Sequence, residues 1–296
     1  MPLPRAFRHI SAMVAMAPAA AIVLVVYVGC SIWSAKVSMT NSKLMANGSY
    51  VGLAQYTKLF NNTRWQESVW HLLIIGPIFI AVTLAIGVLL AILIDQKVRA
   101  ESFFRTIYLY PFSMSFVVTG LVWQWMLNPS VGIEKLMLDF GFTSFKFNWI
   151  VTESMVVYTI IIALVWHGSG LVMAIALAGL RGIDEDIWKA ARIDGIPAWK
   201  TYLFIIIPML GASLASASIL LVLGVVRLYD IVVSMTNGGP GFGSEVPAKF
   251  VIDNLTERQD IGQATAAATL MLIAVLAVVA PWSYLQYRRE QRGRTA

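Results

Sequence analysis

Three consecutive residues within a long apolar stretch carry chemistry that suits a small polar ligand. Trp166 offers an aromatic face on which a ring of a ligand can stack, and His167 can hydrogen-bond to polar groups. Gly168 has no side chain, so a ligand can approach the backbone there. The alternative is structural: Gly168 and Gly170 permit close helix packing, and His167 bonds to a neighbouring helix. The sequence leaves both interpretations open.

A pair of opposite charges, Arg227 and Asp230, follows another apolar stretch. Within one continuous helix these residues lie a turn apart, where their side chains can pair. An ionisable residue in a membrane helix indicates a transport path by default. The alternative is an ion pair among the outer headgroups, which a long arginine side chain can reach. We expect the two residues to form an outer gate rather than a central binding site.

Motifs for catalysis and nucleotide binding are missing from the sequence. There is no Gly-x4-Gly-Lys-Ser/Thr phosphate loop, no His-Glu-x-x-His and no Gly-x-Ser-x-Gly. The single cysteine, Cys30, can form neither an internal disulfide nor a cysteine metal cluster. We therefore expect no catalytic residue, no metal site and no cofactor in this chain, and we expect that it is not an enzyme.

The distribution of charge predicts the elements that position these residues. The chain of 296 residues is 58% hydrophobic and only 13% charged, whereas about a quarter of the residues of a soluble domain are charged. A membrane-spanning helix needs about 20 apolar residues, and each of six windows without Lys, Arg, Asp or Glu exceeds that length. We predict an all-α integral membrane protein with six transmembrane helices. The windows are Ile10–Ala35, Ser68–Ile94, Thr106–Ile133, Ser154–Leu180, Thr201–Val226 and Ile261–Tyr287.

Basic residues predict the orientation of these helices. With the N-terminus inside, the inner segments hold 13 Lys and Arg in roughly 56 residues, and the outer segments hold 8 in roughly 81. This bias favours a cytoplasmic N-terminus, and an even number of helices places the C-terminus there too. We expect a cytoplasmic tail at 1–10, a transmembrane domain at 11–287 and a second cytoplasmic tail at 288–296. The same bias accounts for the net charge of +6 without a nucleic-acid partner.

One inner segment, 179–201, carries the signals of a short amphipathic helix. Asp184 is a good N-cap, and the two acidic residues after it favour the first turn. The residues predicted to form one apolar face are Ile187, Trp188 and Ala191. Asp194 and Gly195 predict the end of this helix, because glycine readily takes positive φ. The alternative is a plain connector between two membrane helices.

The spacing in this segment resembles the coupling motif of permeases of binding-protein-dependent ABC importers, Glu-Ala-Ala-x3-Gly-x9-Ile-x-Leu-Pro. The matching residues here are Lys189-Ala190-Ala191, Gly195 and Ile205-x-Ile207-Pro208. A second segment, Met235-Thr236-Asn237-Gly238-Gly239-Pro240, is similar to the loop after the next helix in carbohydrate-importer permeases of the maltose type. The sequence departs from the coupling motif twice: Lys189 replaces Glu, and Ile207 replaces Leu.

The resemblance implies the fold of a type I ABC importer permease and a loop that docks on a cytoplasmic ATPase. The residues it assigns to this coupling are Glu185, Trp188, Lys189, Ala190, Ala191, Asp194 and Gly195. Because Lys189 reverses the charge of the usual Glu, we expect it to meet an acidic or neutral surface of the ATPase.

The resemblance also implies a substrate path along the fourth and fifth helices. Its members are Trp166, His167 and Gly168, together with Leu221, Gly224, Val225, Leu228 and Tyr229. Several of these positions are apolar where the maltose permease is polar, which argues against maltose itself as the substrate.

The function that follows is import of a sugar or glycoside, driven by ATP that other subunits hydrolyse. The implied partners are a second permease subunit, two copies of a cytoplasmic ATP-binding subunit that holds ATP and Mg, an external solute-binding protein and membrane lipid. The implied location is the bacterial cytoplasmic (inner) membrane. Alternatives are an importer permease for glycerol phosphate, polyamine or phosphate, a self-sufficient secondary transporter, and an integral-membrane enzyme. Uptake that needs ATP and a separate binding protein would distinguish the importer from the last two.

Overall fold

The computed structural model describes the backbone of residues 5–96 and 98–294, and the side chains of 13–96, 98–277, 280 and 281. This part of the chain is built from helices, with one isolated antiparallel bridge between Thr40 and Tyr50. The all-α fold class is therefore confirmed. The basic side chains of the two predicted cytoplasmic tails, 1–10 and 288–296, lie outside the described residues.

The chain divides into two compact units. The first comprises 1–62 and 250–296. Its N-terminal helix continues through three segments, α1 (Arg5–Ile22), η1 (Val23–Gly29) and α2 (Cys30–Val37). The shorter α3 (Ala54–Phe60) and the long α15 (Ile261–Arg294) complete it, and α15 packs against α2 and α3. An ion pair between Lys58 and Asp260, with 2.9 Å between Nζ and Oδ2, joins α3 to the loop before α15. Helix α14 (Pro247–Thr256) begins at the end of the second unit and continues into the first.

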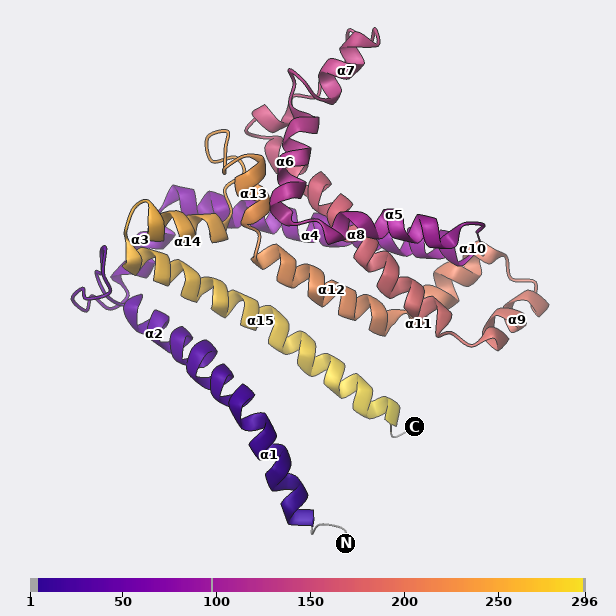
Figure 1. Cartoon of the computed structure of the whole chain (residues 1–296), viewed down its shortest axis with the longest axis horizontal. Coiled ribbons are helices and arrows are strands. Elements are labelled where there is room, and N and C mark those ends of the chain that lie inside the picture. The colour runs from indigo at the N-terminus through magenta and orange to yellow at the C-terminus, as the bar shows by residue number, and fades with distance from the viewer. Residues whose placement is uncertain (1–4, 97, 295–296) are drawn as a thin grey trace. The chain divides into compact units, whose positions relative to one another are not determined.

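The second unit, 63–249, holds most of the residues singled out from the sequence. Its two long helices, α4 (Thr63–Asp95) and α8 (Val156–Arg181), pack along each other, and α5 and α12 pack against α8 (Figure 1). The remaining helices are α5 (Glu101–Ser113), α6 (Phe116–Leu127), α7 (Ile133–Asp139), η2 (Trp149–Val151), α9 (Glu185–Ile193), α10 (Ala198–Lys200), η3 (Thr201–Ile206), α11 (Ile207–Met209), α12 (Gly211–Val226) and α13 (Asp230–Met235).

Two of the predicted continuous spans are broken. The chain turns by 99° between α5 and α6, and by 68° between Met209 and Gly211. At the first break Met114 is extended, and the Ser115 side chain caps α6 by accepting a hydrogen bond from the Val118 backbone N–H at 3.2 Å. Near the second break Pro208 has no backbone N–H to continue the helical hydrogen bonds. Both breaks have local causes in the sequence.

The described residues contain three helices that are long and apolar enough to cross a membrane, or five when each bent pair counts as one span. The three are Met13–Val37, Thr63–Asp95 and Val156–Arg181. The sixth predicted window corresponds to α15, of which Ile261–Ala277 is a shorter apolar helix within the described side chains. The count of six spans stays a prediction.

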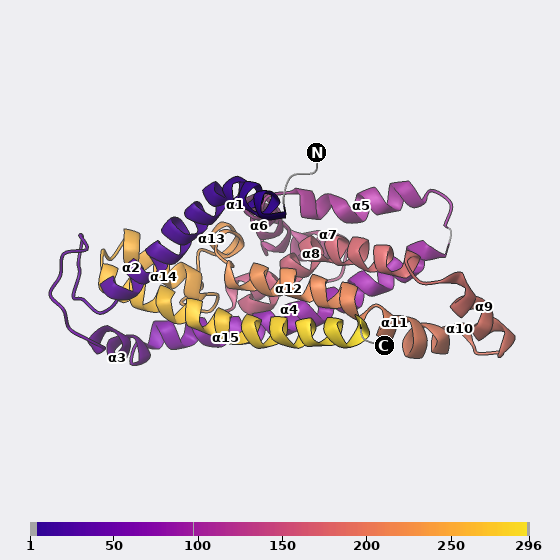
Figure 2. The ribbon, with the colours of Figure 1, turned by 90° about the horizontal axis from the view of Figure 1, so that it is seen from below.

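Contacts near the ends of helices group the predicted inner segments of the second unit at one end. Arg181, at the end of α8, bonds to Glu101 at 2.7 Å and lies 3.8 Å from Asp95. Gln96 donates a hydrogen bond to the hydroxyl of Tyr202. Figure 1 and Figure 2 both show α9 and α10 at this end, near the turn from α4 to α5. We call it the coupling end.

The far end of α4 holds part of a predicted outer segment. Arg64 and Glu245 form a buried ion pair of 2.8 Å, and His71 Nδ1 lies 3.1 Å from the Glu245 carbonyl oxygen. Since α4 has 33 residues, the two ends of the unit are separated by about 50 Å. The predicted inner and outer segments therefore lie at opposite ends of the unit.

Close packing between α5 and α8 depends on Gly170, which gives a first prediction. A Cβ atom added there would lie 1.9 Å from the Tyr108 carbonyl oxygen, whereas one added at Gly224 would meet nothing within 4 Å. We expect Gly170→Ala to lower the free energy of unfolding by about 1–3 kcal/mol through overpacking. Gly224→Ala is the control and is expected to be neutral or slightly stabilising, since alanine favours helix more than glycine does. Thermal unfolding of both variants in detergent checks this, and equal midpoints would contradict it.

Candidate functional site: a coupling helix and a cavity between helices

The predicted amphipathic helix is present as α9, and its ends form as the sequence indicates. Asp184 Oδ1 accepts a hydrogen bond of 2.9 Å from the Asp186 backbone N–H. At the other end Gly195 has φ of +68°, and the Ile196 N–H bonds to the Ala191 carbonyl at 3.0 Å. This hydrogen bond and the one from Gly195 N–H to Arg192 O (3.2 Å) are those of a Schellman motif, which requires the left-handed conformation at residue 195. Gly195 therefore sets the direction in which the chain leaves α9.

The apolar face of α9 packs onto the chain's own helices. Ala191 is buried, and Ile187 and Trp188 pack against a core that includes Leu180 and Ile206. The Trp188 ring meets the Tyr202 ring edge-on, with centroids 5.2 Å apart. Ala191 therefore has little surface to offer a partner, and Trp188 is half-buried, so the apolar face of α9 does not point wholly outward. This packing holds α9 firmly against the helices of the coupling end instead.

The outward surface of α9 consists mainly of other residues. Glu185, Lys189, Ala190, Asp194 and Gly195 are exposed, as the sequence-based assignment requires. Two large apolar side chains were missed: Ile193 at the end of α9 is 85% exposed, and Trp199 on the following α10 is 61% exposed. An apolar residue at the end of a short helix looks the same in the sequence whether it faces the core or solvent.

Lys189, which replaces the Glu of the family motif, has partners in its own helix. Its ammonium group lies 2.9 Å from Asp186 Oδ1 and 4.0 Å from Glu185 Oε2. Both pairs have helical i,i+3 or i,i+4 spacing and are exposed to solvent, so each contributes little stability. They orient the lysine along the acidic first turn.

Four of the predicted path residues line one small cavity of about 70 Å³ in the middle of the second unit. They are His167 and Gly168 on α8, and Leu221 and Gly224 on α12. Three phenylalanines complete much of the wall: Phe79 from α4, Phe112 from α5 and Phe116 from α6. Because α5 ends and α6 begins on either side of the 99° bend, both phenylalanines reach the same cavity.

His167 contacts aromatic and polar side chains around this cavity. Its side chain is buried, and its ring lies 4.5 Å from the Phe116 ring and 5.7 Å from the Phe112 ring. Nδ1 is 3.3 Å from Thr119 Oγ1 on α6. His167 thus bonds to a neighbouring helix, which is the structural alternative, and lines the cavity as well.

The two cavity glycines differ in their surroundings. A Cβ atom at Gly168 would lie 3.3 Å from Thr83 and 3.4 Å from Phe79, so this glycine supports the packing of α8 on α4. A Cβ atom at Gly224 would meet nothing within 4 Å. Gly224 therefore leaves open space in the cavity wall.

The other predicted path residues lie elsewhere. Trp166 faces a different groove and meets the Trp123 ring edge-on at 5.9 Å. Val225 and Leu228 are buried in the hydrophobic core, and Tyr229 is half-buried at the start of α13. The sequence places all eight path residues on two helices, but it does not tell which side of each helix faces the cavity.

The predicted one-turn spacing of Arg227 and Asp230 is wrong. Helix α12 ends at Val226, and α13 begins at Asp230, so the two residues flank a break and do not share a helix. No ion pair joins them in the described part of the chain, where both side chains are exposed. The single continuous helix that the one-turn spacing assumed therefore ends before Arg227.

The phenylalanines of the cavity were missed by the sequence analysis. Phe112 and Phe116 lie in an apolar window that also contains Trp123 and Trp125, so aromatic content alone does not mark them. The available signal was Pro111 followed by Ser113 and Ser115, which indicates a helix break and a new N-cap. A break there brings the end of α5 and the start of α6 to the same cavity.

Apolar spanning helices, an amphipathic helix fixed at one end and a small cavity between bent helices define a membrane transport component. Residues 83–292 match the family described as binding-protein-dependent transport system inner membrane component. The chain belongs to this family, which confirms the resemblance found in the coupling motif and places the protein among multi-pass inner membrane proteins.

Two relatives illustrate the family. A probable ABC transporter permease protein of Pyrococcus horikoshii is 37% identical over 88% of this chain and 90% of its own length. The xylose/arabinose import permease protein of Haloferax volcanii is 32% identical over 81% of this chain and 76% of its own length. A bacterial ABC transporter involved in the import of the acidic polysaccharide alginate has the same fold, with a TM-score of 0.80 and 16% identity over 96% of this chain and 99% of that one. The predicted fold of an ABC importer permease is thereby confirmed.

Proposed function

We propose that this chain imports a sugar or glycoside that an external binding protein delivers, and that α9 couples the movement to a separate ATPase. The observation that carries the proposal is the Schellman turn at Gly195, since it fixes an exposed helix at the coupling end of a family member. Relatives named for xylose/arabinose and glucose import support a sugar as the substrate class.

The proposed assembly contains a second permease subunit, two ATP-binding subunits that hold ATP and Mg, and the binding protein. We place the coupling end and both termini in the cytoplasm, following the distribution of basic residues. An alginate transporter solved in complex with an oligosaccharide-bound periplasmic protein has the same fold and supports the binding-protein partner.

The mechanism follows from how α9 is held. It lies between the end of α8 and the start of α10, and its apolar face packs on a core to which α4, α8 and η3 contribute. Movement of the ATPase against the exposed Ala190 and Ile193 is therefore transmitted to α8 and, through η3 and α11, to α12, because packed interiors resist compression. Those two helices carry His167, Gly168, Leu221 and Gly224, so motion at α9 changes the width of the cavity.

The cavity favours an uncharged solute. Its lining is aromatic and aliphatic, with one histidine and no acidic or basic side chain from the described residues besides it. Glycerol phosphate, phosphate and polyamines would lose hydration there without gaining a counter-charge. Sugar rings can instead place their apolar faces on phenylalanine rings.

A transport assay tests the proposal directly. The importer reconstituted in vesicles is expected to take up its sugar only when ATP is supplied on the side of the ATPase and the binding protein on the other side. Uptake driven by an ion gradient, without ATP or binding protein, would show a secondary transporter and would overturn the proposal. Ligand profiling of the binding protein identifies the sugar.

A further inference from the structure

A second, larger cavity lies on the side of the second unit, between α4, α5 and α8. Its volume is about 620 Å³, and its walls are almost entirely apolar. Residues that line it include Val82 and Ile86 from α4, Ile107 from α5, and Val165, Trp166 and Ser169 from α8. The hydroxyl of Ser169 is directed to the Trp166 carbonyl at 3.4 Å, so even this polar group has a partner within its own helix. Such a lining suits hydrocarbon rather than a polar solute.

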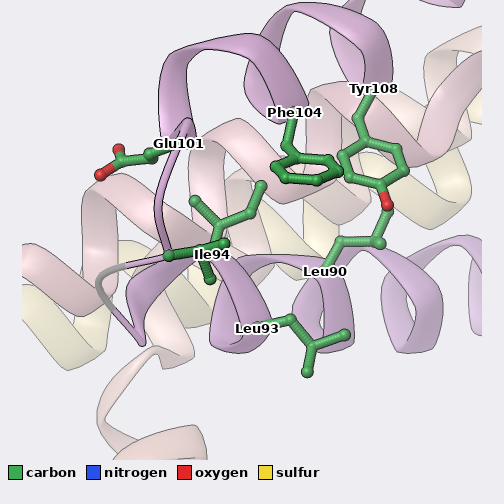
Figure 3. Close-up of a pocket in the computed structure, with 7 residues that line it drawn as sticks. Leu90, Leu93, Ile94, Glu101, Phe104 and Tyr108 are labelled. Carbon is green, nitrogen blue, oxygen red and sulfur yellow. The ribbon is translucent and has the colours of Figure 1, made fainter.

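A smaller cavity of about 150 Å³ continues along the same two helices toward the coupling end. Both cavities are lined by Leu90 and Tyr108, so they adjoin between α4 and α5. Figure 3 shows Phe104 and Tyr108 of α5 above Leu90 and Ile94 of α4, with the Glu101 carboxylate pointing away from the rings. We call the two cavities together the lateral groove.

The end of the lateral groove is positively charged. Glu101 and Asp95 share Arg181, at 2.7 Å and 3.8 Å, so the charges of these three residues together with Arg99 and Arg105 leave a net +1. Arg99 and Arg105 lie on either side of Glu101 in the sequence, and both are exposed. Neither guanidinium has an ion pair or side-chain hydrogen bond within the described residues. Their immediate neighbours in the sequence, Val98 and Phe104, line the smaller cavity, which places the two arginines next to the end of the lateral groove.

We propose that the lateral groove binds one acyl chain of an anionic phospholipid, whose headgroup phosphate is held by Arg99 and Arg105. An apolar channel beside two spanning helices accepts hydrocarbon, and basic residues at its cytoplasmic end attract anionic headgroups. The orientation given under Proposed function decides only which leaflet of the membrane, the cytoplasmic one, supplies this lipid. The lipid is chosen over a protein partner because of this charge complementarity.

Lipid retention by the purified full chain tests the proposal. The protein is exchanged into an equal mixture of phosphatidylglycerol and phosphatidylcholine, extracted in mild detergent and examined by native mass spectrometry. Wild-type protein is expected to retain phosphatidylglycerol in excess. Leu90→Trp and Ser169→Phe, which fill the groove from α4 and α8, should lose this lipid about tenfold or more. Leu89→Trp is the matched control, because Leu89 is 55% exposed on α4 and does not line either cavity.

A double variant, Arg99→Gln with Arg105→Gln, distinguishes binding of the lipid headgroup from binding of the acyl chain. We expect it to lose the preference for phosphatidylglycerol while still retaining lipid of either kind. Equal retention of both lipids by wild-type protein would overturn the headgroup assignment. Equal loss in Leu90→Trp and Leu89→Trp would overturn the groove assignment. So would unchanged lipid in both groove-filling variants together with loss of the second permease on co-purification, since the groove would then be a protein interface. The assay needs no transport, so its result does not depend on the proposed substrate.

Discussion

Replacing Gly195 with valine is expected to abolish uptake while leaving membrane insertion intact. The Schellman turn needs φ of +68° at this position, and a β-branched residue is rarely found there. Strain of about 1–3 kcal/mol would favour another backbone conformation, and each 1.4 kcal/mol lowers the correctly turned population about tenfold. A Cβ atom at residue 195 meets nothing within 4 Å, so the effect comes from backbone conformation rather than from a clash.

The matched variant is Gly195→Asn, because asparagine tolerates the left-handed conformation. We expect it to retain a substantial part of the uptake that Gly195→Val loses. The measurements are the amount of protein in the membrane, uptake, and ATP hydrolysis stimulated by the binding protein. Wild-type uptake by the valine variant would show that the turn does not direct coupling. Equal loss in the asparagine and valine variants would show that the side chain, rather than φ, is what the site excludes.

Local features of α9 could be predicted from the sequence because their causes are local. An N-cap aspartate, two acids in the first turn and a glycine after the last turn determine the ends of the helix within a dozen residues. The side on which α9 packs could not be predicted in the same way. Trp188 and Ala191 face the protein because Tyr202 and the ends of α8 and η3 lie there, and this depends on contacts between distant segments.

The apolar windows likewise predicted where most membrane helices lie, but not that two of them bend. A charge-free window shows that a segment is compatible with lipid, and it is insensitive to a turn within the segment. The 99° bend after Ser113 brings Phe112 and Phe116 to His167, which is some 50 residues further along the chain. The cavity is therefore lined partly by Phe112 and Phe116, which the apolar window alone does not distinguish from its other residues.

Gly224→Leu is expected to block uptake by filling the cavity. No atom lies within 4 Å of a Cβ at this position, so the new side chain can enter without displacing the backbone. The cavity is only about 70 Å³, and a leucine side chain would occupy the space between Phe79, Phe116 and His167 that a solute needs. We expect uptake to fall at least about tenfold, because a path that must pass a sugar ring tolerates little added volume. Insertion and thermal unfolding should change little.

Two leucine variants serve for comparison with Gly224→Leu. Gly168→Leu is expected to lose stability as well as uptake, since a Cβ there is already 3.3 Å from Thr83 and 3.4 Å from Phe79. Gly211→Leu is the control on the same helix: it also has open space around the Cβ, but it lies 13 residues, or about 20 Å, from Gly224 and outside the cavity. It should transport normally. Uptake and coupled ATP hydrolysis are measured together in all three. Normal uptake by both the Gly168 and Gly224 variants would leave helix packing as the role of these glycines, whereas a block at Gly224 without loss of stability would assign the solute path to the space between α8 and α12.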